Sequence, residues 1–119
     1  CSTPMVALSR NLANKHAMEM LLTGAKISAS RAGEMGLVNQ VVPSAELRAA
    51  SRAIAKEIAE KSSLTVATGK RAFYQQKEMD LAAAYDYASS IMVDNMLARD
   101  AEEGIAAFME KRAPDWRDE

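Results

Sequence analysis

The stretch AMEMLLTGAKISASRAGEMGLVNQVVP, residues 17–43, sets the pattern that decides the fold. Its apolar start, residues 17–22, predicts a helix, and Gly24 predicts the end of that helix because glycine adopts the left-handed conformation easily. Ser28 is a suitable N-cap for a second short helix, which we expect to end at Gly36. Residues 37–42 are rich in β-branched side chains and stop at Pro43, so they predict one short strand or extended connector.

Outside this stretch the pattern is helical. The expected helices cover residues 5–13, 45–61, 64–76, 81–97 and a last segment from Asp100 to just before Pro114. Ser44 and Asp80 are the expected N-caps of the helices that follow them. Asp100 and Glu103 have the spacing of a capping box, in which each side chain bonds a backbone N–H group of the first turn.

The clearest apolar stripe lies in residues 81–97. It consists of Leu81, Ala84, Tyr85, Ala88, Ile91 and Met92, which repeat at helical spacing. The chain has 119 residues, of which 49% are hydrophobic and only 5% aromatic, with many Ala and Met residues that favour helices. We therefore expect a mainly α protein with at most one short extended segment near residues 37–42.

Composition excludes several classes of function. The formal net charge is −1 with both signs interspersed, so nucleic-acid binding is not expected. No run approaches the roughly 18 apolar residues of a membrane span, and no signal-peptide pattern opens the chain. The first residue is not Met, which suggests an internal start. The single Cys1 cannot form an intrachain disulfide, which fits a reducing compartment.

The residues alone offer little chemistry. His16 and Cys1 are too few for a zinc site, and no metal site is expected. His16 is better explained as a surface or boundary residue. Ser62 and Ser63, although followed by Lys70, are explained as well by helix capping as by catalysis.

Three motifs nevertheless resemble the enoyl-CoA hydratase/isomerase, or crotonase, superfamily. Its members show A-x-E-M/L-x-L-T-G, then I-S-A-x-E-A-x-x-x-G-L-V-x-x-V-V-P, and later D-x-x-E-G-x-x-A-F-x-E-K-R-x-P. The chain carries these at residues 17–24, 27–43 and 100–114, in the same order.

Two departures accompany the resemblance. Arg31 stands where the family commonly has the Glu of a capping box, and a cation in the first turn should weaken that cap. The glycines of the family's P-G-x-G-G-x-x-R-L stretch are missing before the first motif, although Leu8 and Arg10 persist. This start resembles a divergent branch of the family.

The resemblance implies a fold and an activity. The fold would be the C-terminal helical part of a crotonase, with residues 1–43 ending the core region and residues 44–119 forming a helical region for trimerisation and closure over CoA. The activity would be hydration or isomerisation of a 2-enoyl-CoA, with an oxyanion hole stabilising an enolate. By the same resemblance the acids and the oxyanion hole lie before Cys1, so no catalytic residue is assigned here.

The resemblance also implies partners and a location. The substrate would be an acyl-CoA thioester with no further cofactor, and the assembly a trimer or a dimer of trimers. The location would be the mitochondrial matrix in a eukaryote and the cytoplasm in a bacterium. Phe108 and Lys111 match family positions that contact the CoA nucleotide, where an aromatic edge packs on adenine and an ammonium suits phosphate.

A purely structural role remains an alternative explanation for both residues. Phe108 lies on the apolar face of the last helix and would serve equally as core, and Lys111 lies near a helix C-terminus, where a cation is favoured. A second hypothesis makes the chain a non-catalytic helical association module. Its interface would be the stripe Leu81, Tyr85, Ala88, Met92 and Met96.

Overall fold

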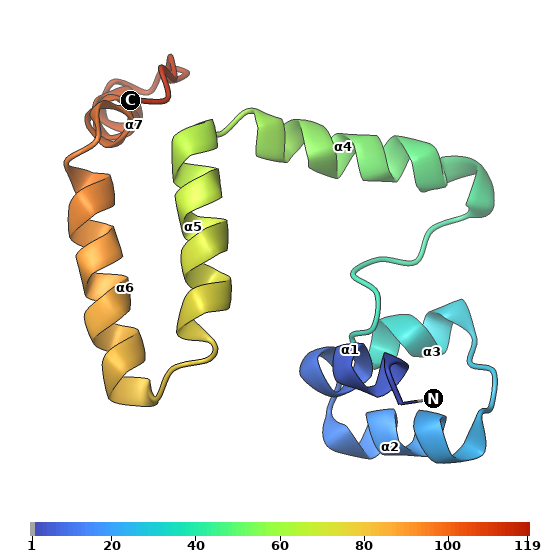
Figure 1. Ribbon diagram of the computed structural model, residues 1–119. Coiled ribbons are helices and arrows are strands. Elements are labelled where there is room, and N and C mark those ends of the chain that lie inside the picture. Colours follow the sequence, from blue (N-terminus) through green and yellow to red (C-terminus); the bar gives the residue numbers. More distant parts are fainter. Residues whose placement is uncertain (1) are drawn as a thin grey trace. The chain divides into compact units, whose positions relative to one another are not determined.

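The computed structural model describes residues 2–119, and Cys1 lies outside the described residues. The elements are α1 (Pro4–Asn11), α2 (Asn14–Thr23), α3 (Ala29–Glu34), the 3-10 turn η1 (Ser44–Glu46), α4 (Leu47–Ala59), α5 (Ser63–Gln76), α6 (Leu81–Met96) and α7 (Arg99–Glu110) (Figure 1). No strand is present among residues 2–119. The mainly α fold class is therefore confirmed.

The chain divides into two compact units, Cys1–Ala50 and Ser51–Glu119. The assignment of residues 1–43 to a core region and 44–119 to trimerisation and CoA closure is a division by role, and it stays a prediction.

In the first unit the expected helix ends are in place. Gly24 ends α2 with φ of 61°, and Ser28 Oγ accepts a hydrogen bond from the backbone N–H of Arg31 at 3.1 Å. Gly36, at φ of 77°, follows α3, and the N–H of Leu37 donates to the carbonyl of Ala32 at 2.9 Å. This is the Schellman arrangement, in which a left-handed residue lets the chain satisfy the last carbonyls of a helix.

The segment after α3, expected to be a short strand or an extended connector, forms no strand: residues 37–39 bend, and residues 40–42 have no regular structure. It folds back along α3 instead. A Cβ added at Gly33 would meet the side chain of Val41 at 3.2 Å, so glycine in α3 makes room for that contact. Because no second strand lies beside the segment, side-chain packing on α3 takes the place of a ladder.

Ser44 does not directly precede an α-helix, as the prediction had it. It opens the 3-10 turn η1, whose N-cap residue is Pro43, and α4 begins at Leu47. The N–H of Glu46 donates to the carbonyl of Pro43 at 2.8 Å. This backbone bond closes a 3-10 turn, and the α-helix starts directly after it at Leu47.

In the second unit α5 and α6 run side by side in opposite directions (Figure 1). Asp80 Oδ1 accepts a hydrogen bond from the N–H of Ala83 at 2.9 Å, which confirms the cap of α6. Near that end the hydroxyl of Tyr87 donates to Gln75 Oε1 at 2.7 Å, and at the other end Thr65 Oγ1 donates to Asn95 Oδ1 at 3.3 Å. These two polar contacts fix the register of the pair.

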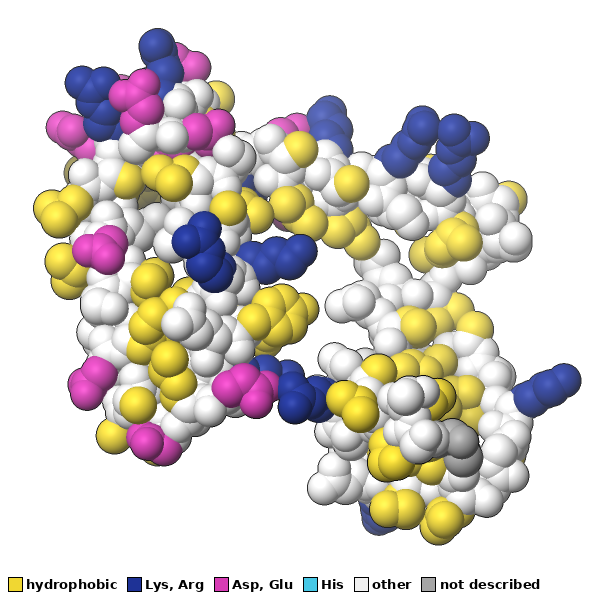
Figure 2. All heavy atoms as spheres, in the orientation of Figure 1, with side chains coloured by type: hydrophobic (Ala, Val, Ile, Leu, Met, Phe, Trp, Pro, Cys, Tyr) yellow, Lys and Arg dark blue, Asp and Glu magenta, His cyan; other side chains and the backbone are white. Residues whose placement is uncertain are grey.

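The second unit buries few large side chains. Ala107 is its buried apolar residue, beside buried Ser62 and Asp100. Most of the predicted stripe on α6 is exposed, with Leu81 76% and Tyr85 69% accessible, while its members Ala84 and Ile91 are half-buried. Figure 2 shows hydrophobic side chains open to solvent over the α5–α6 pair and along α4. Such contiguous apolar surface is typical of a face that packs against other protein.

Candidate functional site

A groove of about 510 Å³ lies between α5, α6, α7 and the C-terminal segment. Its walls are mainly apolar and include Met96, Ile105, Phe108 and Trp116, while its polar lining atoms come from Lys61, Ser62, Thr65, Asn95 and Asp100. A concave apolar surface with a few convergent polar groups is the usual form of a small-molecule site.

Phe108 borders this groove from α7. Its side chain is 82% exposed, so within the second unit it is not a core residue. The apolar-face position of Phe108 was expected from the sequence, and the structure places the ring at the edge of the groove. The ring is thus accessible to a ligand or to another protein surface.

Lys111 has a different role in the backbone. It ends α7 in the left-handed conformation with φ of 55°, its N–H donates to the carbonyl of Phe108, and the next N–H, of Arg112, donates to Ala107 at 3.0 Å. This is again a Schellman end, built on a lysine where glycine is usual. Lys111 is exposed and does not line the groove, so the structure does not bring it together with Phe108 in that pocket.

The expected capping box of Asp100 and Glu103 is wrong. Helix α7 starts at Arg99, its N-cap residue is Ala98, and no side chain caps it. Asp100, only 2% exposed, instead accepts hydrogen bonds from the N–H groups of Arg117 at 2.8 Å and Asp118 at 3.1 Å. The reason is that the C-terminal segment returns to this position and its N–H groups take the carboxylate.

Electrostatics follow from these bonds. A hydrogen bond from Ser62, and then the backbone N–H groups of Arg117 and Asp118, hold the pKa of Asp100 below its usual value, because each donor stabilises the charged form. The backbone N–H of Asp100 in turn donates to the carbonyl of Glu119 at 3.1 Å. The carboxylate is thus buried, and hydrogen bonds from the C-terminal segment and from Ser62 satisfy it.

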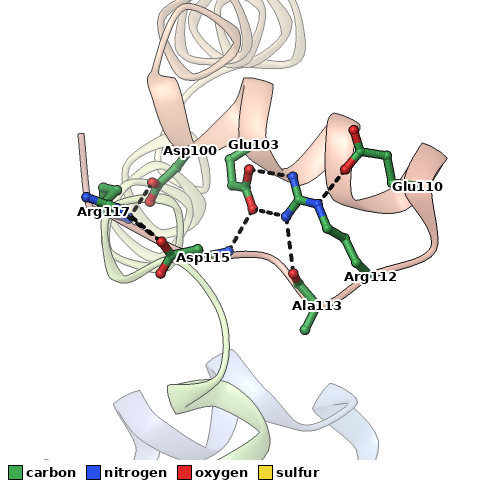
Figure 3. Close-up of polar contacts among 7 residues, drawn as sticks. All are labelled: Asp100, Glu103, Glu110, Arg112, Ala113, Asp115 and Arg117. Carbon is green, nitrogen blue, oxygen red and sulfur yellow. Dashed lines mark hydrogen bonds and ion pairs between the residues drawn. The ribbon is translucent and has the colours of Figure 1, made fainter.

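Glu103, within α7, forms hydrogen bonds with residues that follow the end of this helix (Figure 3). Both of its oxygens accept hydrogen bonds from the guanidinium of Arg112, and Oε1 also accepts from the N–H of Asp115 at 2.7 Å. The bonds from Arg112, followed by that of Asp115, lower the pKa of Glu103 to about 2. A forked pair of this kind fixes geometry as well as charge.

Trp116 forms one wall of the groove. Its Nε1 donates to the carbonyl of Glu60 at 2.8 Å, and a Cβ added at Gly104 would come within 3.2 Å of the indole. Glycine in the middle of α7 therefore lets the ring lie against the helix backbone. The sequence did not identify Trp116 or Asp118 as residues of this site. The one local signal for the C-terminal segment is a tryptophan that closely follows Pro114.

The remaining candidates have structural roles. Ser62 Oγ accepts from the N–H of Thr65 at 3.2 Å and so caps α5, as the capping explanation predicts. His16 is half-buried at the edge of α2, and its Nδ1 has no hydrogen-bond partner. Arg31 pairs with Glu34 at 3.1 Å on the exposed surface of α3. Within residues 2–119 no group of His, Asp or Glu side chains has metal-site geometry, and no helix there is long and apolar enough to cross a membrane.

Comparison with known proteins gives consistent matches. The sequence model of the family described as enoyl-CoA hydratase/isomerase matches residues 2–119. The mitochondrial enoyl-CoA hydratase domain-containing protein 3 of Homo sapiens is 50% identical over 119 residues, which are 100% of this chain and 39% of that protein. This protein represents the branch that the start of the chain resembles. The chain thus spans about two fifths of the length of such relatives.

Solved structures agree with the sequence matches. An enoyl-CoA hydratase from Mycobacterium smegmatis superposes with a TM-score of 0.94 at 47% identity, over 98% of this chain and 45% of that one. The human domain-containing protein 3 superposes with a TM-score of 0.92 at 50% identity, over 98% and 46% of the two chains. Motifs, fold and relatives therefore agree, and the chain belongs to the enoyl-CoA hydratase/isomerase family.

Proposed function

We propose that the chain is the C-terminal helical part of an acyl-CoA enzyme, which hydrates or isomerises a 2-enoyl-CoA through an enolate held in an oxyanion hole. In this proposal the residues before Cys1 supply the proton-transferring acids and the oxyanion hole, and the described helices close over the CoA thioester. Support comes from the family match over residues 2–119. No cofactor beyond the CoA of the substrate is needed for such chemistry.

The observation that best supports CoA binding by this chain is the exposure of Phe108. A ring that is 82% exposed at the rim of an apolar groove offers a stacking face for a purine. Lys111, exposed one turn further along, would place an ammonium near the phosphates of the same nucleotide. Both roles are proposals for these two residues.

A calorimetric titration of the 119-residue chain with CoA tests these two contacts. We expect weak binding that Phe108→Ala abolishes, while the matched variant Met109→Ala leaves it unchanged. Met109 is an exposed neighbour on α7 that does not line the groove. Equal affinities for the two variants would contradict contact between Phe108 and CoA.

Activity gives a second test. We expect the purified chain to show no hydration of crotonyl-CoA above the buffer rate, because no residue in it is proposed to move the proton. Measurable turnover that scales with protein concentration would overturn the placement of the acids before Cys1.

Oligomeric state and location belong to the same proposal. We infer a homo-oligomer of the trimer or dimer-of-trimers kind for the whole enzyme, and the mitochondrial matrix as its place in a eukaryote. The human and rat relatives carry the word mitochondrial in their names, which supports this location. A bacterial protein of this type would be cytoplasmic.

The second candidate function is a helical association module. The observation in its favour is the exposed stripe on α6, where Leu81, Tyr85 and Met92 are all more than half accessible. Light scattering would detect self-association through such a face. Self-association combined with complete indifference to CoA would favour the module over the acyl-CoA enzyme.

A further inference from the structure

We infer that residues 115–119 form a latch which is held by carboxylates and detaches on acidification while the α5–α6 pair stays folded. The inference goes beyond the proposed function and does not depend on it. It rests on how this segment is attached to the rest of the second unit.

Three carboxylates make the attachment. Asp100 accepts the N–H groups of Arg117 and Asp118. Asp118 reaches back to the start of α5, where its Oδ1 accepts the N–H groups of Ser63 at 2.8 Å and Leu64 at 3.3 Å. Glu103 accepts the N–H of Asp115. Each bond gains strength from the negative charge of its acceptor, so protonation weakens all of them together.

The other attachments are few. The indole of Trp116 donates to Glu60, and Arg99 pairs with Glu119 at 2.8 Å. Both side chains of that ion pair are more than half exposed, and exposed pairs contribute little to stability. The indole and the backbone bond from the N–H of Asp100 to the carbonyl of Glu119 would then have to hold the segment once the carboxylates are protonated.

The surrounding charges favour release at low pH. The charged groups around the three carboxylates are Glu60 and Lys61 before α5, Arg99, Glu110 and Arg112 at the two ends of α7, and Asp115, Arg117 and Glu119 in the segment itself. When the acids are protonated, Lys61, Arg99, Arg112 and Arg117 keep their positive charges. Their mutual repulsion opposes the docked position of the segment.

The pair α5–α6 is attached differently. Its cross-contacts, Tyr87 to Gln75 and Thr65 to Asn95, join neutral groups. Among these contacts only the cap at Asp80 depends on a carboxylate. Acid therefore removes the latch without removing what holds the two helices together.

The pH window follows from the direction of the pKa shifts. The folded-state pKa values of Asp100, Glu103 and Asp118 are all lowered. Their contribution is present above the ordinary carboxyl range, near pH 4, and is lost as the pH falls through the folded values. Release should begin below about pH 4 and end near the value of about 2 for Glu103.

The experiment uses the single tryptophan of the chain, Trp116, as reporter. Tryptophan fluorescence and far-ultraviolet circular dichroism of the 119-residue chain are recorded from pH 7 to pH 2. We expect the emission to shift to the red at a higher pH than the loss of helix signal. Coincident transitions would overturn the latch as a separate unit.

Variants sharpen the test. Asp100→Asn should give the red-shifted emission already at neutral pH, whereas Asp94→Asn, a matched change on the exposed side of α6, should not. If Asp100→Asn fails to fold, Asp118→Asn serves instead, since its carboxylate lies on the exposed segment. An emission like that of the unaltered chain from a folded Asp100→Asn or Asp118→Asn variant would overturn the inference.

Discussion

Asp118 caps a helix that begins 55 residues earlier in the chain: its Oδ1 accepts the N–H of Ser63 at 2.8 Å. Ser62 caps the same helix locally through the N–H of Thr65. The start of α5 is therefore satisfied by one side chain from its own sequence and by one from the C-terminal segment.

The cap of α6 should behave as an ordinary local cap. Asp80→Ala removes the acceptor for the N–H of Ala83 and should cost about 1 kcal/mol of unfolding free energy. Urea denaturation followed by circular dichroism measures this. Asp86→Ala, an exposed aspartate within the same helix, is the control and should change stability by much less. Equal losses in the two variants would contradict the assigned cap.

The caps also explain which elements the sequence could predict. Ser28, Asp80 and Gly24 act on groups within four residues of themselves, so a local pattern contains all the information. Asp100 has equally good local spacing, yet its partners are 17 and 18 residues away. Local pattern cannot show that distant N–H groups will compete for the same carboxylate, and it therefore predicted a capping box.

The candidate site shows the same division. Phe108 could be placed on the apolar face of the last helix from its spacing, and the family resemblance gave it a ligand role. The groove beside it depends on Trp116, which reaches Glu60 across 56 residues. A contact of that range depends on how the whole unit folds, and no periodicity in the sequence encodes it.

The two helical glycines of the second unit should respond differently to alanine. Gly69→Ala meets nothing within 4 Å and should stabilise α5 by about 1 kcal/mol through helix propensity. Gly104→Ala would press on the indole of Trp116 at 3.2 Å, so the helical gain is offset by displacement of the ring. Tryptophan emission should shift in Gly104→Ala alone. A shift in both variants, or in neither, would speak against this packing.

The left-handed end of α7 allows stability to be separated from binding. Lys111→Gly relieves a positive φ of 55° and should stabilise the chain by about 1 kcal/mol. The same change removes the ammonium proposed to meet CoA phosphate, so affinity for CoA should fall. Thermal melting and calorimetry report the two effects. A less stable glycine variant would contradict the strain, and unchanged CoA affinity would contradict the contact.

Glu103 should make stability depend on pH in a defined window. Its pKa is lowered from an ordinary value of 4.5 to about 2, chiefly by the guanidinium of Arg112. A lowered folded-state pKa means that the stabilisation is present above about pH 4.5 and is lost as the pH falls toward 2. Glu103→Gln cannot titrate, so its melting temperature should fall less steeply across this window than that of the unaltered chain. Glu102→Gln, at the exposed neighbouring position on α7, should keep the full slope. If Glu103→Gln melts with the full slope as well, the forked pair with Arg112 does not govern the acid sensitivity of this end of the molecule.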